Sequence, residues 1–146
     1  MKNERGQSLV ELAISLTVLL YLLSGAAEFG IIFFKFIQLR DAAQEGALYA
    51  SLYPLDNAGI QQRVRNASNS PIDLSVNDLY AGARVTVNYP EDDCVEDPVE
   101  VRVLHRHRIF MPFMPQILNR PWIELNATVT DTILQTSNPA CPGYTP

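Results

Sequence analysis

The sequence predicts an α+β protein in which a long N-terminal hydrophobic helix packs on a small domain with an antiparallel β-sheet. Three observations lead to this fold class. Near the N-terminus, the sixteen residues from Leu12 to Ala27 carry no charge. Residues 35–52 then repeat apolar side chains at three- or four-residue spacing, which marks one face of a helix. Beyond residue 70, apolar and polar residues alternate in short segments, as in strands with one buried face.

The N-terminal apolar run is long enough to span a bilayer. Glu28 interrupts it once, and a second apolar block continues from Phe29 to Phe34. As a helix, residues 12–34 would measure roughly 35 Å, whereas the hydrocarbon core of a bilayer is about 30 Å thick. The small residues at 24–27 lead back into apolar sequence rather than into a polar start. We therefore reject a cleaved secretory signal peptide.

Two carboxylates accompany this run, and a charge inside a spanning helix costs about 2.5–3.5 kcal/mol. Glu11 lies near the helix N-terminus, where the helix dipole favours a carboxylate; alternatively, it has a partner in a neighbouring molecule. Glu28 either lies at the far membrane interface, with the span ending near Ala27, or lies buried with a role in assembly. Both glutamates are candidate assembly residues.

The helix is expected to continue beyond the bilayer, because no strong stop signal precedes Tyr53-Pro54. One apolar face of this continuation would pack on the outer domain. Its members are Phe36, Leu39, Ala43, Ala47 and Ala50. Residues 8–52 would form a rod roughly 65–70 Å long.

The outer domain combines a short helix with a sheet. The helix is expected from Ala58 to about Ala67, with Asp56 or Asn57 as its N-cap and with Ile60 and Val64 facing inward. Alternation predicts an antiparallel sheet with one wet face and one buried face. The alternating residues are Ile72, Leu74 and Val76; Val85, Val87 and Tyr89; Val99, Val101 and Val103; and Ile123, Leu125, Ala127, Val129 and Ile133.

Cys94 and Cys141 lie in polar, proline-flanked loops beyond the apolar run, where the compartment is expected to be oxidising. We favour a disulfide between them, with two free thiols as the alternative. A bridge across the 46 intervening residues would add about 3–4 kcal/mol by the loop-entropy model.

Candidate metal and catalytic groups are weak, and we predict no enzyme, no metal and no cofactor. The acidic loop lacks the calcium-hand pattern, so a solvated loop is favoured over a calcium site. It contains Glu91, Asp92, Asp93, Glu96 and Asp97. His105 and His107 would share one strand face, but a zinc site needs a third ligand and none is evident nearby. No nucleophile elbow is recognisable. The net charge of −5, without a basic patch, argues against nucleic-acid binding.

Residues 109–118, Ile-Phe-Met-Pro-Phe-Met-Pro-Gln-Ile-Leu, are too apolar for an ordinary exposed loop. The favoured interpretation is a loop folded over the core of its own domain. The alternative is a contact patch for a neighbouring subunit, with Phe110, Phe113 and Trp122 as the anchors.

Three blocks of the N-terminal region resemble a known family. They are Arg5-Gly6-Gln7-Ser8-Leu9-Val10-Glu11, Glu28-Phe29-Gly30 and Ala42-Ala43-Gln44-Glu45-Gly46-Ala47-Leu48-Tyr49-Ala50. Over residues 5–52 the chain is similar to TadE-like proteins, the pilin-like components of tight-adherence (Flp) pilus systems. Beyond Tyr53 the resemblance is only architectural.

The resemblance implies a prepilin-type leader that ends at Gly6, so that Gln7 becomes the first mature residue. Glu11 would then be the fifth, the acidic position that in type IV pilin-like proteins pairs with the N-terminal amine of a neighbouring subunit. In one departure from the family, the first half of the apolar run contains no proline. This absence favours a straighter helix, because proline removes a helical hydrogen bond.

The expected organisation is a short basic leader (1–6), a transmembrane or filament-core helix (7–52) and an extracellular α+β domain (53–146). The leading hypothesis is a non-enzymatic, pilin-like structural subunit. It would insert into the bacterial inner membrane with its basic N-terminus in the cytoplasm and later enter an extracellular filament. Expected partners are copies of itself or other pilin-like subunits, a prepilin-type peptidase and the tight-adherence assembly machinery. The alternative is a permanently membrane-anchored, extracytoplasmic binding or adhesion domain.

Overall fold

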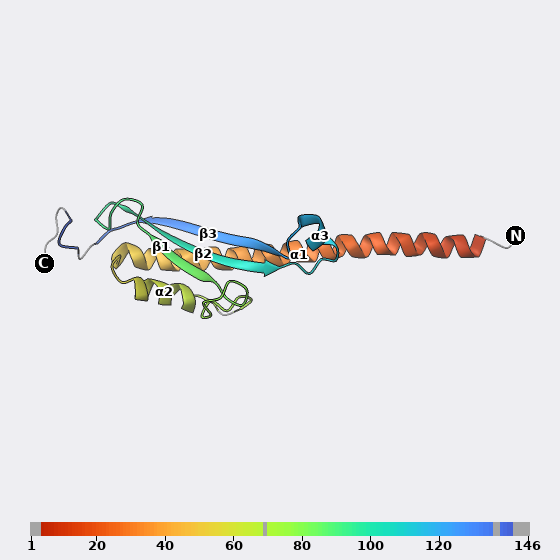
Figure 1. The fold of residues 1–146 in the computed structure, drawn as a ribbon, viewed down its shortest axis with the longest axis horizontal. Helices are drawn as coiled ribbons and strands as arrows, with labels where there is room; N and C mark the ends of the chain where they lie inside the picture. Colours follow the sequence, from red (N-terminus) through yellow and green to blue (C-terminus); the bar gives the residue numbers. More distant parts are fainter. Residues whose placement is uncertain (1–3, 69, 136–137, 142–146) are drawn as a thin grey trace.

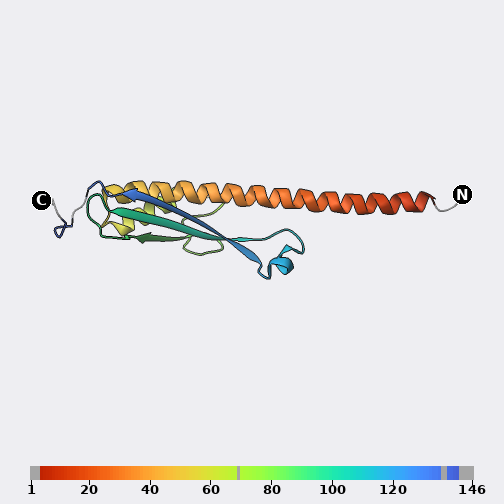
Figure 2. The same ribbon diagram turned by 90° about the horizontal axis from the view of Figure 1, so that it is seen from above.

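A computed structural model describes residues 4–68, 70–135 and 138–141 of the protein. Its elements follow in the order α1 (Glu4–Leu52), α2 (Asn57–Asn66), β1 (Arg84–Asn88), β2 (Pro98–Arg108), α3 (Met114–Leu118) and β3 (Trp122–Thr132). α2 and the sheet pack along the C-terminal half of α1, whose N-terminal half projects away from them (Figures 1 and 2). The predicted α+β fold class is confirmed. Residues 1–3 of the expected leader and 142–146 of the expected domain lie outside the described residues.

α1 is one uninterrupted helix of 49 residues, roughly 70 Å long at the rise of an α-helix. Residues 6–20 are exposed on every side of the helix. The second half contributes small and apolar side chains to the core, namely Leu39, Ala42, Ala43, Ala47 and Ala50. Phe36 was expected on the same face, but 38 % of its surface is exposed, so that prediction is wrong.

The sheet has the order β1-β2-β3, and both pairs are antiparallel. β2 and β3 pair along their whole length, from Pro98 opposite Thr132 to Arg108 opposite Trp122. In Figure 2 they run lengthwise beside α1. Alternate β2 side chains, including Val101 and Val103, are fully buried, whereas their neighbours are wholly or partly exposed. This is the predicted pattern of one wet and one buried face.

α2 agrees with the predicted helix to within a residue at each end. The side chain of Asp56 caps it by accepting a hydrogen bond from the backbone N–H of Gly59 at 2.9 Å. Ile60 and Val64 are fully buried, as expected. The cap and the apolar spacing therefore suffice to explain where this helix starts and which way it faces.

Residues 72–76 form no strand, so this part of the sheet prediction is wrong. The side-chain amide of Gln38 on α1 takes the place of a neighbouring strand. It donates to the carbonyl of Ile72 at 2.9 Å and accepts from the N–H of Ile72 at 3.2 Å. Since both buried backbone groups are thus satisfied, the segment can follow a loop path. Ile72 and Leu74 are nevertheless buried, whereas 38 % of the surface of Val76 is exposed.

Small residues on α1 allow three elements to meet closely at Gly46. A β-carbon there would lie 2.4 Å from Cγ2 of Val64 on α2 and 3.1 Å from Cγ1 of Val101 on β2. The first distance is shorter than a van der Waals contact, so the position has room only for hydrogen.

Replacing Gly46 by Ala should lower the free energy of unfolding by about 1–3 kcal/mol, the usual cost of overpacking a core. Gly30→Ala is the matched control on the same helix, because a β-carbon at Gly30 would meet no heavy atom within 4 Å. The control should be neutral or slightly stabilising, since Ala favours helices more than Gly does. Thermal unfolding of both full-length variants in one detergent measures the difference. Equal stabilities would contradict the close packing at Gly46.

Candidate functional site

The first candidate site is the exposed N-terminal half of α1. The helix from Gly6 to Leu52 is long and apolar enough to cross a membrane, with a mean hydropathy of 2.0 in its most apolar window. None of that window is buried, so this is not the core helix of a soluble domain. The large exposed side chains of residues 9–23 point to all sides of the helix. Such an all-round apolar surface needs either lipid or other helices as its surroundings.

Gly6, Gln7 and Glu11 all lie in this exposed segment. Within residues 4–68, 70–135 and 138–141, the carboxylate of Glu11 has no hydrogen-bond or ion-pair partner. A partner for Glu11 would therefore come from another molecule or from outside the described residues.

Glu28 differs, because its carboxylate is buried and bound within its own chain. Its Oε1 accepts a hydrogen bond from Nε2 of His107 at 2.6 Å. Its Oε2 accepts the backbone N–H groups of Phe110 and Met111, both at 2.9 Å. Glu28 thus holds the end of β2 against α1 and needs no partner from a second subunit.

Lys35, two turns further along α1, lies between two buried histidines. Its Nζ is 3.4 Å from Nε2 of His105 and 3.2 Å from Nδ1 of His107. Nδ1 of His105 lies 2.6 Å from the carbonyl oxygen of Gly82. Only 2 % of the surface of His105 and 1 % of that of His107 is exposed. We call Glu28, Lys35, His105 and His107 the boundary network.

One arrangement of protons satisfies all contacts of the boundary network. The Lys35 ammonium donates to both histidines, and both imidazoles are neutral. His107 then donates its Nε2–H to Glu28, and His105 donates its Nδ1–H to Gly82. Protonating either imidazole would place an N–H group against the ammonium. In this arrangement the network holds one cation and one anion joined through the ring of His107.

Two pKa shifts oppose additional positive charge in the network. Burial is the main cause that lowers the pKa of His105; the hydrogen bond to Gly82 acts against it, and the charges of Lys35 and His107 add to the lowering. Burial also lowers the pKa of Lys35, against the attraction of the Glu28 carboxylate, which raises it.

The predicted common face of His105 and His107 exists, but its third neighbour is an ammonium group rather than a metal ligand. Lys35 was not anticipated as a site residue. Glu28 and Lys35 are seven residues apart and therefore share a helix face, just as the two histidines share a strand face. These two pairs of polar residues, one on an apolar helix and one on a strand, could have indicated from the sequence that the helix and the strand pack together here.

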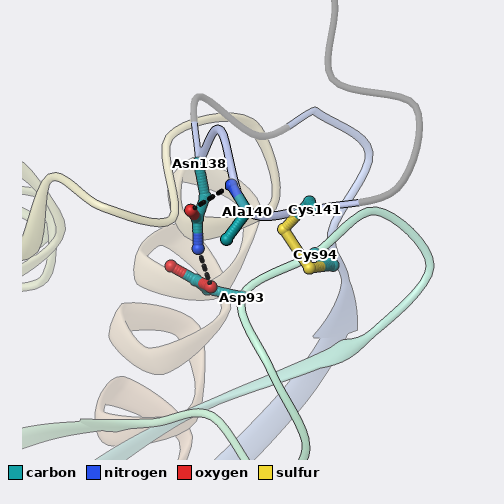
Figure 3. Close-up of a disulfide and its surroundings, with 5 residues drawn as sticks. All are labelled: Asp93, Cys94, Asn138, Ala140 and Cys141. Carbon is teal, nitrogen blue, oxygen red and sulfur yellow. Dashed lines mark hydrogen bonds between the residues drawn. A yellow bond between two sulfur atoms is a disulfide. The ribbon is translucent and has the colours of Figure 1, made fainter.

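Cys94 and Cys141 form a disulfide, with their Cα atoms 5.4 Å apart (Figure 3). It joins the loop between β1 and β2 to the segment after β3. Potential ligand atoms of Asp93, Cys94 and Cys141 lie within 4.8 Å of one another. The two sulfurs are bonded to each other, however, and Asp93 accepts a hydrogen bond from Asn138 at 2.7 Å. This cluster is therefore a structural tie rather than a set of free ligands.

The loop of residues 109–121, which we call the hairpin tip, contains the short helix α3 that the sequence did not predict. Ile109 and Met111 are buried, with 6 % and 8 % of their surfaces exposed. Phe110, Phe113 and Ile117 are 69 %, 69 % and 71 % exposed. The tip therefore buries Ile109 and Met111, neither of which belongs to the main core cluster, and the interpretation as a loop folded over the core of its own domain does not hold for the exposed side chains.

Trp122, the third residue of the predicted contact patch, begins β3 and lies opposite Arg108 of β2. Its ring packs edge-on against Tyr80, with the centroids 6.0 Å apart. The guanidinium of Arg106 lies 5.5 Å from its centroid. Trp122 is thus half-buried by its own domain.

Residues 6–48 match the family model described as TadE-like protein. The match confirms the resemblance seen in the N-terminal blocks, and it covers most of α1. No curated protein and no solved structure matches the chain. The TadE-like match and the exposed apolar helix together fit a pilin-like, membrane-anchored protein associated with a tight-adherence pilus.

Removing the carboxylate of Glu28 should release the hairpin tip from α1. Glu28→Ala leaves His107 and the N–H groups of Phe110 and Met111 without their acceptor. Losing one partner of a buried charged network costs about 3–5 kcal/mol. Hydrogen exchange at the amides of Phe110 and Met111 should accelerate accordingly.

The matched control for this variant is Glu45→Ala, which removes an exposed carboxylate from the same helix. Its stability should change by no more than about 0.5 kcal/mol. Unchanged exchange at both amides of Glu28→Ala would refute the role assigned to Glu28.

Acidification should destabilise the boundary network. Because burial lowers the folded-state pKa of His105 below 6.5, the unfolded chain binds more protons as the pH falls. The contribution of neutral His105 to the free energy of unfolding is complete above about pH 6.5. It is lost as the pH falls from there toward the lowered folded-state pKa of His105. His105→Asn keeps a donor for Gly82 but removes this titration. Its unfolding free energy, measured between about pH 5 and 7, should depend less steeply on pH than that of the native protein. If the unfolding free energies of His105→Asn and of the native protein depend equally on pH, His105 is not the group responsible.

Proposed function

We propose that this protein is a pilin-like structural subunit of a tight-adherence-type filament. α1 would first insert into the inner membrane and later pack against α1 helices of other subunits outside the cell. The observation that supports the proposal is the all-round apolar, exposed half of α1, which continues without a break into a folded domain. The TadE-like match lies on this same helix.

The apolar surface of α1 suits both environments. Lipid tails and neighbouring apolar helices satisfy the same side chains, so transfer from bilayer to filament exposes no additional apolar area to water. Glu11 would fix the axial register between neighbouring subunits. A lone carboxylate is costly in an apolar environment, and the amine of a neighbouring subunit would offset that cost.

The processing site and the partners belong to the same proposal. Gly6 would end the leader, and a prepilin-type peptidase would release Gln7 as the first mature residue. Residues 53–146 would then lie outside the cell. Glu28 would contribute to assembly indirectly, because it fixes how the domain sits on α1. Phe110, Phe113 and Trp122 would contact a neighbouring subunit within the filament.

A permanently anchored binding domain is the second candidate function. The burial of Glu28 against its own domain favours it, since that carboxylate needs no neighbour. Under this alternative, α1 would stay in the bilayer and the full-length protein would be recovered only from the membrane fraction.

Glu11→Gln should leave membrane insertion intact but abolish recovery of the protein in filaments sheared from the cell surface, because the neutral amide cannot form the ion pair. Glu45→Gln is the control, since it neutralises an exposed carboxylate outside the apolar segment, and it should assemble normally. The intact mass of the sheared native protein would identify Gln7 as the first residue if Gly6 is processed. Normal assembly of Glu11→Gln would exclude the proposed pairing.

A further inference from the structure

The hairpin tip lies beside the part of α1 where a membrane span would end. The side chain of Met111 lies against Gly25, because a β-carbon built on Gly25 would be 3.3 Å from the methyl carbon of Met111. Glu28 binds the backbone N–H groups of Phe110 and Met111. The tip is therefore level with residues 25–28 of α1.

This level falls inside the thickness of a bilayer. The charge-free residues 12–27 measure roughly 24 Å as a helix, whereas the hydrocarbon core is about 30 Å thick. A bilayer that begins at Leu12 would therefore extend about four residues beyond Ala27. Phe29 and Phe33 are 69 % and 54 % exposed, so the exposed apolar surface of α1 continues beyond Ala27.

The exposed side chains of the tip have the chemistry of a membrane contact. Phe110, Phe113 and Ile117 are each about 70 % exposed, and Leu118 is 44 % exposed. Residues 109–121 contain no Asp or Glu, and Arg120 is exposed among them. The acidic residues of the 91–97 loop precede β2 at its other end, away from the N-terminal half of α1 (Figure 1). The domain therefore has an apolar, weakly basic end at residues 109–121, which favours anionic headgroups. Its opposite end, at residues 91–97, is acidic and favours water.

We infer that the hairpin tip is a second membrane contact, which inserts Phe110, Phe113 and Ile117 into the outer-leaflet interface beside α1. The inference rests on the proposed function in one respect, namely that α1 spans the bilayer before assembly. Lipid is favoured over a second copy of the chain because the tip lies at the depth where the apolar band of α1 itself faces lipid. Phe110 and Met111 bind the Glu28 carboxylate through their N–H groups, so insertion of the tip would also shield this charge from the hydrocarbon.

Depth-dependent quenching of a single tryptophan tests the inference on the full-length protein. The Trp122→Phe background removes the one native tryptophan. A tryptophan is then introduced by Phe113→Trp at the tip, by Leu20→Trp in the apolar half of α1, or by Val95→Trp in the acidic loop. Each protein is reconstituted in phosphatidylethanolamine–phosphatidylglycerol vesicles whose acyl chains are brominated at a shallow or a deep position. Circular dichroism verifies that each variant retains the native fold.

The expected result is that shallow bromines quench most of the emission of Phe113→Trp, with a blue shift relative to Val95→Trp. Deep bromines should quench Leu20→Trp, and aqueous acrylamide should quench Val95→Trp. If Leu20→Trp is quenched by lipid but Phe113→Trp is quenched only by acrylamide, the tip inference is overturned while the membrane span stands. If Leu20→Trp is not quenched by lipid, the span and the inference both fall. If Phe113→Trp is shielded from lipid and acrylamide alike, and dilution with lipid removes the shielding, a second copy covers the tip and the inference is wrong.

Discussion

The structure depends on the continuity of α1, because one rigid helix must satisfy two different surroundings. Its N-terminal half is apolar on all sides, whereas its C-terminal half has a single buried stripe of small residues. The two halves belong to one straight helix, because residues 4–52 contain no proline that would bend it. The position of the domain is therefore fixed relative to the apolar segment, and every contact of the domain with a membrane or a filament follows from that alignment.

The boundary network lies where the exposed half of α1 gives way to the half that packs on the domain. Its carboxylate and ammonium lie on α1, and its two neutral imidazoles come from β2. A charged pair alone would be costly to bury at this depth, but the imidazoles and two backbone N–H groups complete its hydrogen bonds. These polar side chains thus attach the domain to α1 at the end of its exposed apolar half.

α1, α2 and the main strands were predictable because they follow local rules: a charge-free run, a capping Asp56, and period-two alternation in β2 and β3, whereas α3 was not predicted. The segment at Ile72 was not, since its strand-like pattern is satisfied by Gln38, which is 34 residues away in the chain. The partnership of Lys35 with His105 and His107 likewise depends on how far β2 slides along α1. Register between distant elements comes from packing around Gly46 and from the tip contacts, which no single segment encodes.

The lengthwise alignment of β2 and β3 with α1 has a mechanical consequence. A force along the axis of α1 would act on all contacts between helix and sheet in parallel, as shear, rather than opening them one at a time. The Glu28 carboxylate at one end of the helix–sheet contact, and the carbonyl of Ser51 at the other, which accepts the N–H of Leu134 at 2.8 Å, oppose separation of the sheet from α1. A surface fibre built from such subunits would transmit tension through its helices while the outer domains stay folded.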